Sequence, residues 1–190
     1  MTDIFGVESE IAKRIAESLQ AKLNGREEQA LAAKPTNNPE AYDAYLRGLA
    51  LTARSVFSHE NDLLRKAGSF YEGAVQLDPN FAIAWARLCR ADPLLYFNDP
   101  APAIRGAAKH ALDNAQKLEP ESLETLLGLG YYQYWVLRDY GLAKTMFGRV
   151  GKMLPSSSEV PYALALITRR EGNWDQSIAY SEQALSLGSA

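Results

Sequence analysis

Apolar residues recur at steps of three and four along most of the chain, and they do not alternate with a period of two. Steps of three or four place side chains on one face of an α-helix, whereas strict alternation is typical of β-strands. The long segments are filled by Ala, Leu, Glu, Lys, Arg and Gln, which favour helices, while Val, Ile and Thr are scattered. The pattern predicts an all-α protein.

A short ladder of side chains recurs four times with steps of four, three and five residues. The first three rungs mostly run small, large, small, and the last position is a proline in three copies. Such steps place the rungs on one helix face, where small residues let a neighbouring helix approach closely. The proline cannot continue the helix and predicts a turn. The ladders are Ala67, Tyr71, Ala74, Pro79; Ala108, Leu112, Ala115, Pro120; Ala143, Phe147, Val150, Pro155; and Ser177, Ser181, Ala184, Ser189.

A second amphipathic helix is predicted before each ladder, with one small residue near its middle: Gly48, Cys89, Gly130 or Ala165. The helix and the ladder together resemble the two halves of the tetratricopeptide (TPR) repeat, and EGNWDQSIAYSEQAL (171–185) is the closest match. The resemblance begins at about Pro39. It implies an α-solenoid of about four helix pairs, with repeats at about 39–79, 80–120, 121–155 and 156–190.

The first two repeats each carry seven extra residues between the small residue and the ladder. Seven residues make about two helical turns, so longer helices would keep their buried stripe in phase. We expect 52–62 to form such an extension and a turn, whereas Pro93 and the run 98–102 favour a kink and a loop. Within the 92–103 insertion, residues 94–97 either fold back as core, which we expect, or form an exposed interface.

Residues 1–34 do not follow the ladder. Apolar residues at steps of four from Val7 to Leu23 predict one amphipathic helix, and a shorter helix follows over 26–33. We expect this segment to cap the array or to end an upstream domain. Residues 35–38 form a linker, with Asn38 as the N-cap of the next helix and Pro39 at its first position. The repeat array then spans 39–190.

The N-terminal segment also carries a resemblance of its own. DIFGVESEIAKRIAESLQAKL, followed by NPEAYDAYLRG, resembles the junction before a TPR array in bacterial class III adenylate/guanylate cyclases and transcriptional regulators. The similarity covers about residues 3–50 and implies that the chain is a fragment of a larger signalling protein. The end of the chain, LSLGSA, agrees, because no capping helix follows it. The paired aspartates of a cyclase catalytic domain are absent.

Charge and composition exclude several classes of protein. Twenty Lys and Arg residues against 23 Asp and Glu residues give a formal net charge of −3, too balanced for a nucleic-acid-binding domain. No segment reaches the ~20 apolar residues of a membrane span, and the N-terminus lacks the features of a secretion signal. A single cysteine excludes an intrachain disulfide and a cysteine-cluster metal site. We expect a cytoplasmic, water-soluble protein.

No catalytic constellation is found in the sequence. His59 and His110 lie in different repeats without metal-ligand spacing, and we expect both on the solvated surface. Cys89 occupies a small position at a helix crossing, where burial is expected rather than nucleophilic chemistry. The sequence contains no phosphate-binding or dinucleotide-binding motif. We therefore expect no enzymatic activity, no cofactor and no metal.

The TPR resemblance implies binding of a peptide or protein in a concave groove lined by the first helix of each pair. Tyr and Arg are common at binding hot spots, although some of the aromatic residues must instead pack the core. The Arg169–Arg170 pair is either a solvated face or an anion site, and the family's Lys and Asn clamp for carboxylates is not matched. By register, the groove residues are Tyr42, Tyr45, Arg90, Tyr131, Tyr134, Trp135, Tyr162, Arg169 and Arg170.

Two functions follow from these expectations. The first is a non-catalytic protein–protein interaction module. The alternative is a regulatory or oligomerising C-terminal segment of a larger signalling protein, and a homo-oligomer is compatible with both. The sequence does not identify the partner, because groove chemistry varies independently of the fold.

Overall fold

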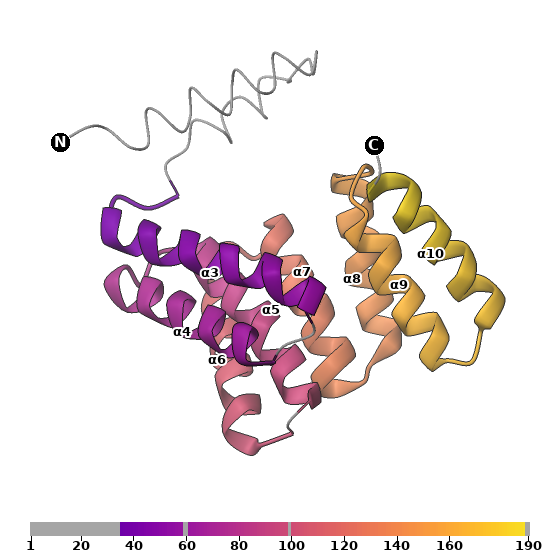
Figure 1. Cartoon of the computed structure of the whole chain (residues 1–190), viewed down its shortest axis with the longest axis horizontal. Helices are drawn as coiled ribbons and strands as arrows, with labels where there is room; N and C mark the ends of the chain where they lie inside the picture. The colour runs from indigo at the N-terminus through magenta and orange to yellow at the C-terminus, as the bar shows by residue number, and fades with distance from the viewer. Residues whose placement is uncertain (1–34, 59–60, 99, 189–190) are drawn as a thin grey trace, which may run out of the picture. The chain divides into compact units, whose positions relative to one another are not determined.

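A computed structural model of the chain describes residues 35–58, 61–98 and 100–188, and all regular structure among them is helical (Figure 1). The chain divides into two compact units, Met1–Asn37 and Asn38–Ala190. The second unit contains every helix described below. The two helices expected within 1–34 lie outside the described residues.

The second unit consists of four consecutive helix pairs. The first pair is α3 (Pro39–Ser58) with α4 (Asn61–Leu77), and the second is α5 (Ala82–Asn98) with α6 (Pro102–Leu118). In the third, α7 (Leu123–Tyr131) continues into the π-helical turn η1 (Tyr132–Leu137) and is followed by α8 (Tyr140–Met153). The fourth is α9 (Glu159–Arg170) with α10 (Trp174–Gly188).

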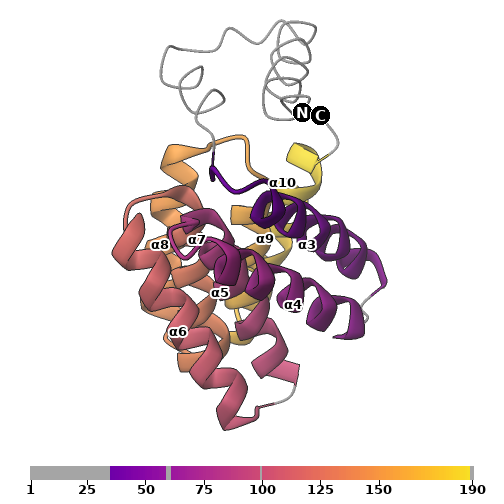
Figure 2. The same ribbon diagram turned by 90° about the vertical axis from the view of Figure 1, so that its left-hand side faces the viewer.

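The two helices of each pair pack against each other, and α5 also packs against α4 and α7. Figure 1 shows the pairs following one another in chain order from α3 to α10, and Figure 2 shows α3 and α4 side by side. This arrangement is the TPR-like α-solenoid that the repeats predict. The all-α fold class is therefore confirmed.

The ladder residues lie at the helix crossings. Ala67, Ala108 and Ala143 are completely buried, which confirms their expected place where paired helices meet. The large rung packs over the glycine of the preceding helix. A Cβ atom added to Gly48 would lie 2.5 Å from the Tyr71 ring, and one added to Gly130 would lie 2.9 Å from the Phe147 ring. Glycine at these positions permits an aromatic ring to lie directly against helical backbone.

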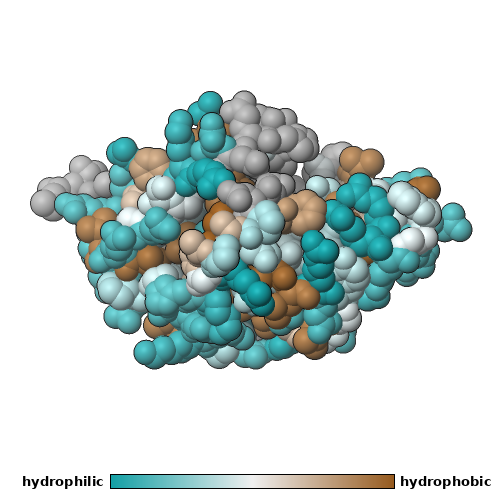
Figure 3. Space-filling view, turned by 90° about the horizontal axis from the view of Figure 1, so that it is seen from below, coloured by the Kyte–Doolittle hydropathy of each residue, from teal (hydrophilic) through white to brown (hydrophobic). Residues whose placement is uncertain are grey.

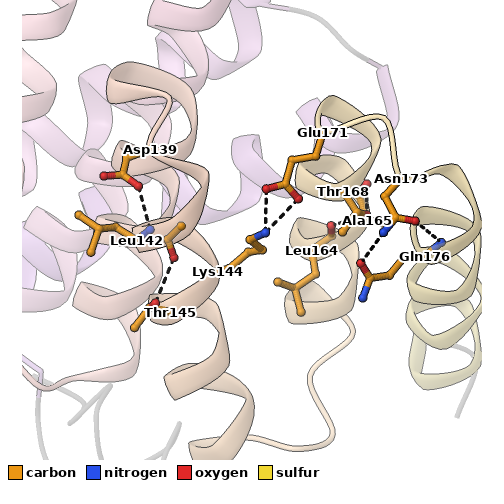
Figure 4. Close-up of polar contacts among 11 residues, drawn as sticks. Asp139, Leu142, Lys144, Thr145, Leu164, Ala165, Thr168, Glu171, Asn173 and Gln176 are labelled. Atoms are coloured by element: carbon orange, nitrogen blue, oxygen red, sulfur yellow. Dashed lines mark hydrogen bonds and ion pairs between the residues drawn. The ribbon is translucent and has the colours of Figure 1, made fainter.

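Polar side chains define where several helices begin. The Oδ1 atom of Asn38 accepts hydrogen bonds from the amides of Glu40 and Ala41, at 3.0 and 3.1 Å, which confirms the predicted N-cap. The Asn38 Nδ2 atom donates to the Leu77 carbonyl at 3.0 Å and so links the start of α3 to the end of α4. Ser122, Asp139 and Asn173 accept equivalent bonds at the starts of α7, α8 and α10; the last two are drawn in Figure 4.

The extra residues of the second repeat extend α5 beyond Pro93, and the loop expected within 98–102 connects α5 to α6. Helix α5 continues through Pro93 to Asn98. Pro93 is fully buried among packed helices, and this packing offsets the backbone hydrogen bond that a proline cannot donate. The insertions of both repeats lengthen the second helices as well, since α4 and α6 begin six residues before Ala67 and Ala108.

The lengthened helix ends form a small core of their own. Leu64 of α4 and Leu95 of α5 are buried there, with Leu94 and Ile104 packed against them. The prediction that residues 94–97 belong to the core therefore holds for Leu95 and in part for Leu94 and Tyr96. Phe97 is 36% exposed. The larger cores join α3–α6 with η1, and α7–α9 with η1. None of the described helices is both long and apolar enough to span a membrane.

Candidate protein-binding surface

The first helices of the second, third and fourth pairs meet at an ion pair. Arg90 of α5 pairs with Glu159 of α9, and both side chains are about three-quarters buried. The Arg90 guanidinium also lies over the ring of Tyr131 from α7, 5.6 Å from its centroid. Burial and the nearby Glu159 charge raise the pKa of Tyr131 well above its usual value. Arg90 and Tyr131, both predicted groove residues, are thus brought together and fill the space between these helices.

The predicted groove residues of the first pair lie partly in the core. Tyr45 is buried, and its ring centroid lies 5.2 Å from that of Phe81. Tyr42 stacks on Tyr45 at 6.1 Å and is half-buried. Burial is the largest cause of the raised pKa of Tyr45. Tyr45 therefore serves packing, and Tyr42 offers only part of its ring to solvent.

The π-helical turn η1 carries the two other aromatic residues predicted for the third repeat. Tyr134 is almost completely buried, and its hydroxyl donates to the carbonyl of Leu166 in α9 at 3.2 Å. Trp135 is half-buried, and its ring lies 4.2 Å from that of Tyr134. A π-turn is wider than an α-turn, so steps of three and four no longer keep residues on one face. The turn ends at Arg138, whose φ of 58° is left-handed.

Aromatic and arginine side chains gather beyond the ion pair, at the C-terminal ends of α5, η1 and α9. The ring of Phe97 lies 4.5 Å from that of Trp135, and the Arg170 guanidinium lies 4.9 Å above the Phe97 ring. Phe97, Trp135 and Arg170 line a small hollow, and Arg138 lines it as well. Arg169 precedes Arg170 at the end of α9, and Tyr162 lies on the same exposed face about two turns closer to the start of this helix. We call this set the aromatic–arginine surface: Phe97, Trp135, Arg138, Tyr162, Arg169 and Arg170.

A salt bridge between helices supports the end of α9. Figure 4 shows Lys144 of α8 reaching Glu171, the residue that follows α9, with Nζ–Oε distances of 2.7 and 3.0 Å. Glu171 directly follows Arg169 and Arg170. Lys144 therefore neutralises the carboxylate nearest in sequence to the two arginines and holds their helix end against α8.

Two residues of this surface, Phe97 and Arg138, were not predicted from the sequence as binding residues. Phe97 lies in the insertion and was expected as core with its neighbours. Arg138 occupies the left-handed position after a helix, where glycine is the usual residue. The absence of a glycine at this point in the sequence was the one signal that could have drawn attention to Arg138. The left-handed backbone of Arg138 ends the helical turn η1 and places this arginine at the edge of the surface.

The cysteine and the described histidine lie in places that do not form a catalytic cluster with each other. Cys89 is buried, and burial raises the pKa of its thiol well above its usual value. His110 is exposed and its ring lies edge-on to Trp85 at 5.4 Å. His59 lies outside the described residues. Within the described part of the chain, no group of three or more His, Cys, Asp or Glu side chains could hold a metal ion.

Comparison with known proteins returns fold neighbours only. No protein-family profile and no curated protein matches the chain. Among solved structures, a crystal structure of MamA is 18% identical with a TM-score of 0.49, covering all of this chain and 96% of that one. A second MamA structure is 17% identical with a TM-score of 0.48, covering 98% and 91%. Likeness at this level carries no argument about function.

Proposed function

We propose that this chain is a non-catalytic protein-interaction module and that the aromatic–arginine surface holds an acidic segment of a partner. One observation carries the proposal. Phe97, Trp135 and Arg170 come from three different helices, and they converge with a cation above an exposed aromatic ring. An arginine at a helix C-terminus by itself would only complement the helix dipole.

The side chains of this surface suit an acidic partner with apolar residues. Phe97 is 36% exposed and Tyr162 is 54% exposed, which leaves apolar area for a partner's side chain. Arg170 lies over the Phe97 ring, Arg138 lines the same hollow, and Arg169 precedes Arg170 in sequence. A guanidinium binds a carboxylate through two parallel hydrogen bonds. Tyr, Trp and Arg are the residue types that dominate binding energy at protein interfaces. Arg90 and Glu159 already pair with each other, so we place the partner on the exposed residues of α9 and at the ends of α5 and η1.

The proposal is tested by crosslinking in cells that express the protein naturally. A photoreactive phenylalanine analogue replaces Tyr162 in one variant and Leu77, an exposed residue at the end of α4, in the control. We expect a crosslinked partner from position 162 only. Arg169→Ala with Arg170→Ala should weaken that crosslink while Lys152→Ala, an exposed control, leaves it unchanged. Capture of the same partner from both positions, or full crosslinking by the double variant, would exclude this surface.

A second candidate function, self-association, is favoured by the outer face of α10. Trp174 and Ile178 lie one turn apart on this helix and are 62% and 57% exposed. Ser181 occupies the large rung of the fourth ladder and is exposed, whereas the equivalent Tyr71 and Phe147 are buried. Sedimentation of the wild type and of Trp174→Glu with Ile178→Glu distinguishes the candidates. A dimer that the substitutions dissociate supports self-association, and a wild-type monomer excludes it.

We also propose a cellular context for this interaction module. Residues 3–50 resemble the junction before the TPR arrays of bacterial cyclase-like and regulator proteins, which favours a cytoplasmic signalling assembly. An open reading frame upstream of Met1 that encodes a catalytic or DNA-binding domain would support it.

A further inference from the structure

The small hollow within the aromatic–arginine surface has a volume of about 30 Å³. Four of the residues that line it are aromatic and two are arginines: Phe97, Tyr134, Trp135, Tyr140, Arg138 and Arg170. They come from the ends of α5, η1 and α9 and from the start of α8. None of these lining residues is acidic, so two guanidinium groups meet at one hollow without a carboxylate between them.

Each of these two arginines is followed in the sequence by an acid that is engaged elsewhere. Asp139, which follows Arg138, accepts a backbone hydrogen bond at 2.9 Å and so caps α8. Glu171, which follows Arg170, is bound by Lys144 at 2.7 and 3.0 Å. Figure 4 shows both contacts. Neither arginine belongs to any of the ion pairs between described residues, and both are exposed to solvent.

The backbone fixes where Arg138 stands at the hollow. Its left-handed conformation ends the turn η1, and the amide of the next residue, Asp139, donates to the carbonyl of Gln133 at 2.9 Å. The turn is thus closed by its own hydrogen bonds, and the position of Arg138 does not depend on a bound ligand.

Aromatic side chains fix Arg170 on the other side of the hollow. Its guanidinium lies 4.9 Å from the centroid of the Phe97 ring. Burial raises the pKa of Tyr134, and the Arg170 guanidinium beside the Tyr134 hydroxyl opposes part of this shift. That hydroxyl already donates to the carbonyl of Leu166 at 3.2 Å. The two guanidinium groups are therefore the charged donors that the hollow offers to a ligand.

The volume of the hollow selects among anions. One water-sized atom needs about 10–15 Å³ of such space, so a hollow of about 30 Å³ holds about two. A carboxylate presents two oxygen atoms, and each can accept hydrogen bonds from a guanidinium. A phosphate group has four oxygen atoms and is too large. The hollow therefore fits a carboxylate better than a phosphate.

We propose that this hollow binds a single carboxylate group between the guanidinium groups of Arg138 and Arg170, while the hydrocarbon stem of the ligand packs on Phe97 and Trp135. The carboxylate belongs either to an acidic side chain or to the C-terminus of a partner, which share this chemistry. The inference rests on the proposed function and deepens it, because it assigns the acidic contact to two of the three arginines. Arg169 does not line the hollow.

The test is a nuclear magnetic resonance titration of the ¹⁵N-labelled full chain with sodium butyrate at constant ionic strength. Butyramide, which has the same shape without the charge, is the neutral probe, and sodium methyl phosphate is the larger anion. We expect saturable shifts of the Trp135 indole signal and of the side-chain Nε signals of Arg138 and Arg170 with butyrate only.

Four single variants locate the site within the surface. Arg138→Gln and Arg170→Gln should each weaken butyrate binding about tenfold, because each removes a charged hydrogen-bond donor. Arg169→Gln should weaken it less than either of these. Arg105→Gln, an exposed arginine of α6 that belongs to no ion pair between described residues, should leave the affinity unchanged. Circular dichroism verifies that every variant is folded.

Three results would overturn the proposal: no saturable shift with butyrate, equal binding of butyramide or methyl phosphate, or full affinity in both the Arg138 and Arg170 variants. If butyrate does not bind while an acidic partner still crosslinks at position 162, the hollow is excluded and the proposed function stands. If butyrate binds as expected and no partner crosslinks there, the hollow stands and the proposed function fails.

Two peptides separate the sources of the carboxylate. Acetyl-Gly-Glu-Gly-amide carries only a side-chain carboxylate, and acetyl-Gly-Gly-Gly carries only a C-terminal one. Tighter binding of the first assigns the hollow to an acidic side chain within a partner's segment, and tighter binding of the second assigns it to the end of a partner's chain. Equal affinity means that the hollow recognises the carboxylate alone.

Discussion

Single small residues set how closely the helices of each pair approach. Phe147 is completely buried, and its ring lies where a side chain on Gly130 would begin. Tyr71 stands in the same relation to Gly48, and its hydroxyl is 2.9 Å from the hydroxyl of Thr52 on the same helix as Gly48. In the first and third repeats, the ladder and the glycine preceding it therefore form one packing unit.

Gly130→Ala tests this packing unit. The new methyl group would overlap the Phe147 ring, and overpacking of a filled core costs about 1–3 kcal/mol of the free energy of unfolding. Gly148→Ala on α8 is the matched control, because its Cβ would meet nothing within 4 Å. Removing a helical glycine without a clash should stabilise by about 0.5–1 kcal/mol. Urea unfolding measures both, and equal effects would contradict the packing described here.

Asp92 should make folding stability depend on pH. Burial, followed by the charge of Glu72, raises the pKa of this carboxyl from 3.8 to about 7. The folded state then holds the proton more tightly than the unfolded chain does, so the stabilisation present below pH 4 is lost as the pH rises through 7. Three pKa units correspond to at most about 4 kcal/mol.

The measurement compares wild type and Asp92→Asn by urea unfolding from pH 4 to 8. We expect the variant's advantage in free energy of unfolding to grow from pH 4 to about 7 and to stay constant above it. Taking the difference between the two proteins cancels the titration of the other carboxyls. A difference that does not change with pH would show that the two states bind this proton equally.

At the scale of the elements, the sequence predicted which segments form helices and how these helices pair. It did not predict where a helix departs from α-helical geometry. Steps of four and three in the ladder report directly on α-helix geometry, so the crossings at Ala67 and Ala143 could be predicted. The π-turn η1 could not, because it depends on how Tyr134 packs against α9 and how Trp135 packs against Phe97 of α5. The continuation of α5 through Pro93 was not predicted either, since burial of the lengthened helix offsets one missing hydrogen bond.

The ion pair between α5 and α9 connects first helices two repeats apart. We expect a double-mutant cycle with Arg90→Met and Glu159→Gln to give a coupling energy of at least about 1 kcal/mol, because both side chains are mostly buried. The same cycle with Lys109→Met and Asp113→Asn should give about 0.5 kcal/mol or less, since that pair is more than half exposed. Equal couplings would mean that the α5–α9 contact contributes little.

At the scale of the whole molecule, the repeat register located the helices of the proposed binding surface but only some of its residues. Trp135, Tyr162, Arg169 and Arg170 were predicted, while Phe97 and Arg138 depend on an insertion and on a turn that the register does not describe. Tyr45 and Tyr134 satisfy the register and are nevertheless buried. Periodicity identifies a helix face, but the curvature of the stack decides how much of that face remains open.

The surface of the molecule also carries more than one candidate site for contact with a partner. Figure 3 shows one face on which hydrophilic residues predominate and apolar residues gather in separate patches. Such patches, rather than single exposed apolar residues, mark interaction sites. The decisive question is whether the aromatic–arginine surface selects a partner by charge.

A selection from a random peptide library on the immobilised full chain answers that question most directly. After counter-selection on a variant with Arg138→Gly, Arg169→Ala and Arg170→Ala, the recovered peptides should carry several acidic residues beside at least one apolar residue. They should bind the wild type at least tenfold more tightly than the variant, whose thermal melting should match that of the wild type. Recovery of basic or uncharged peptides, or of peptides that bind both proteins equally, would contradict the proposed function.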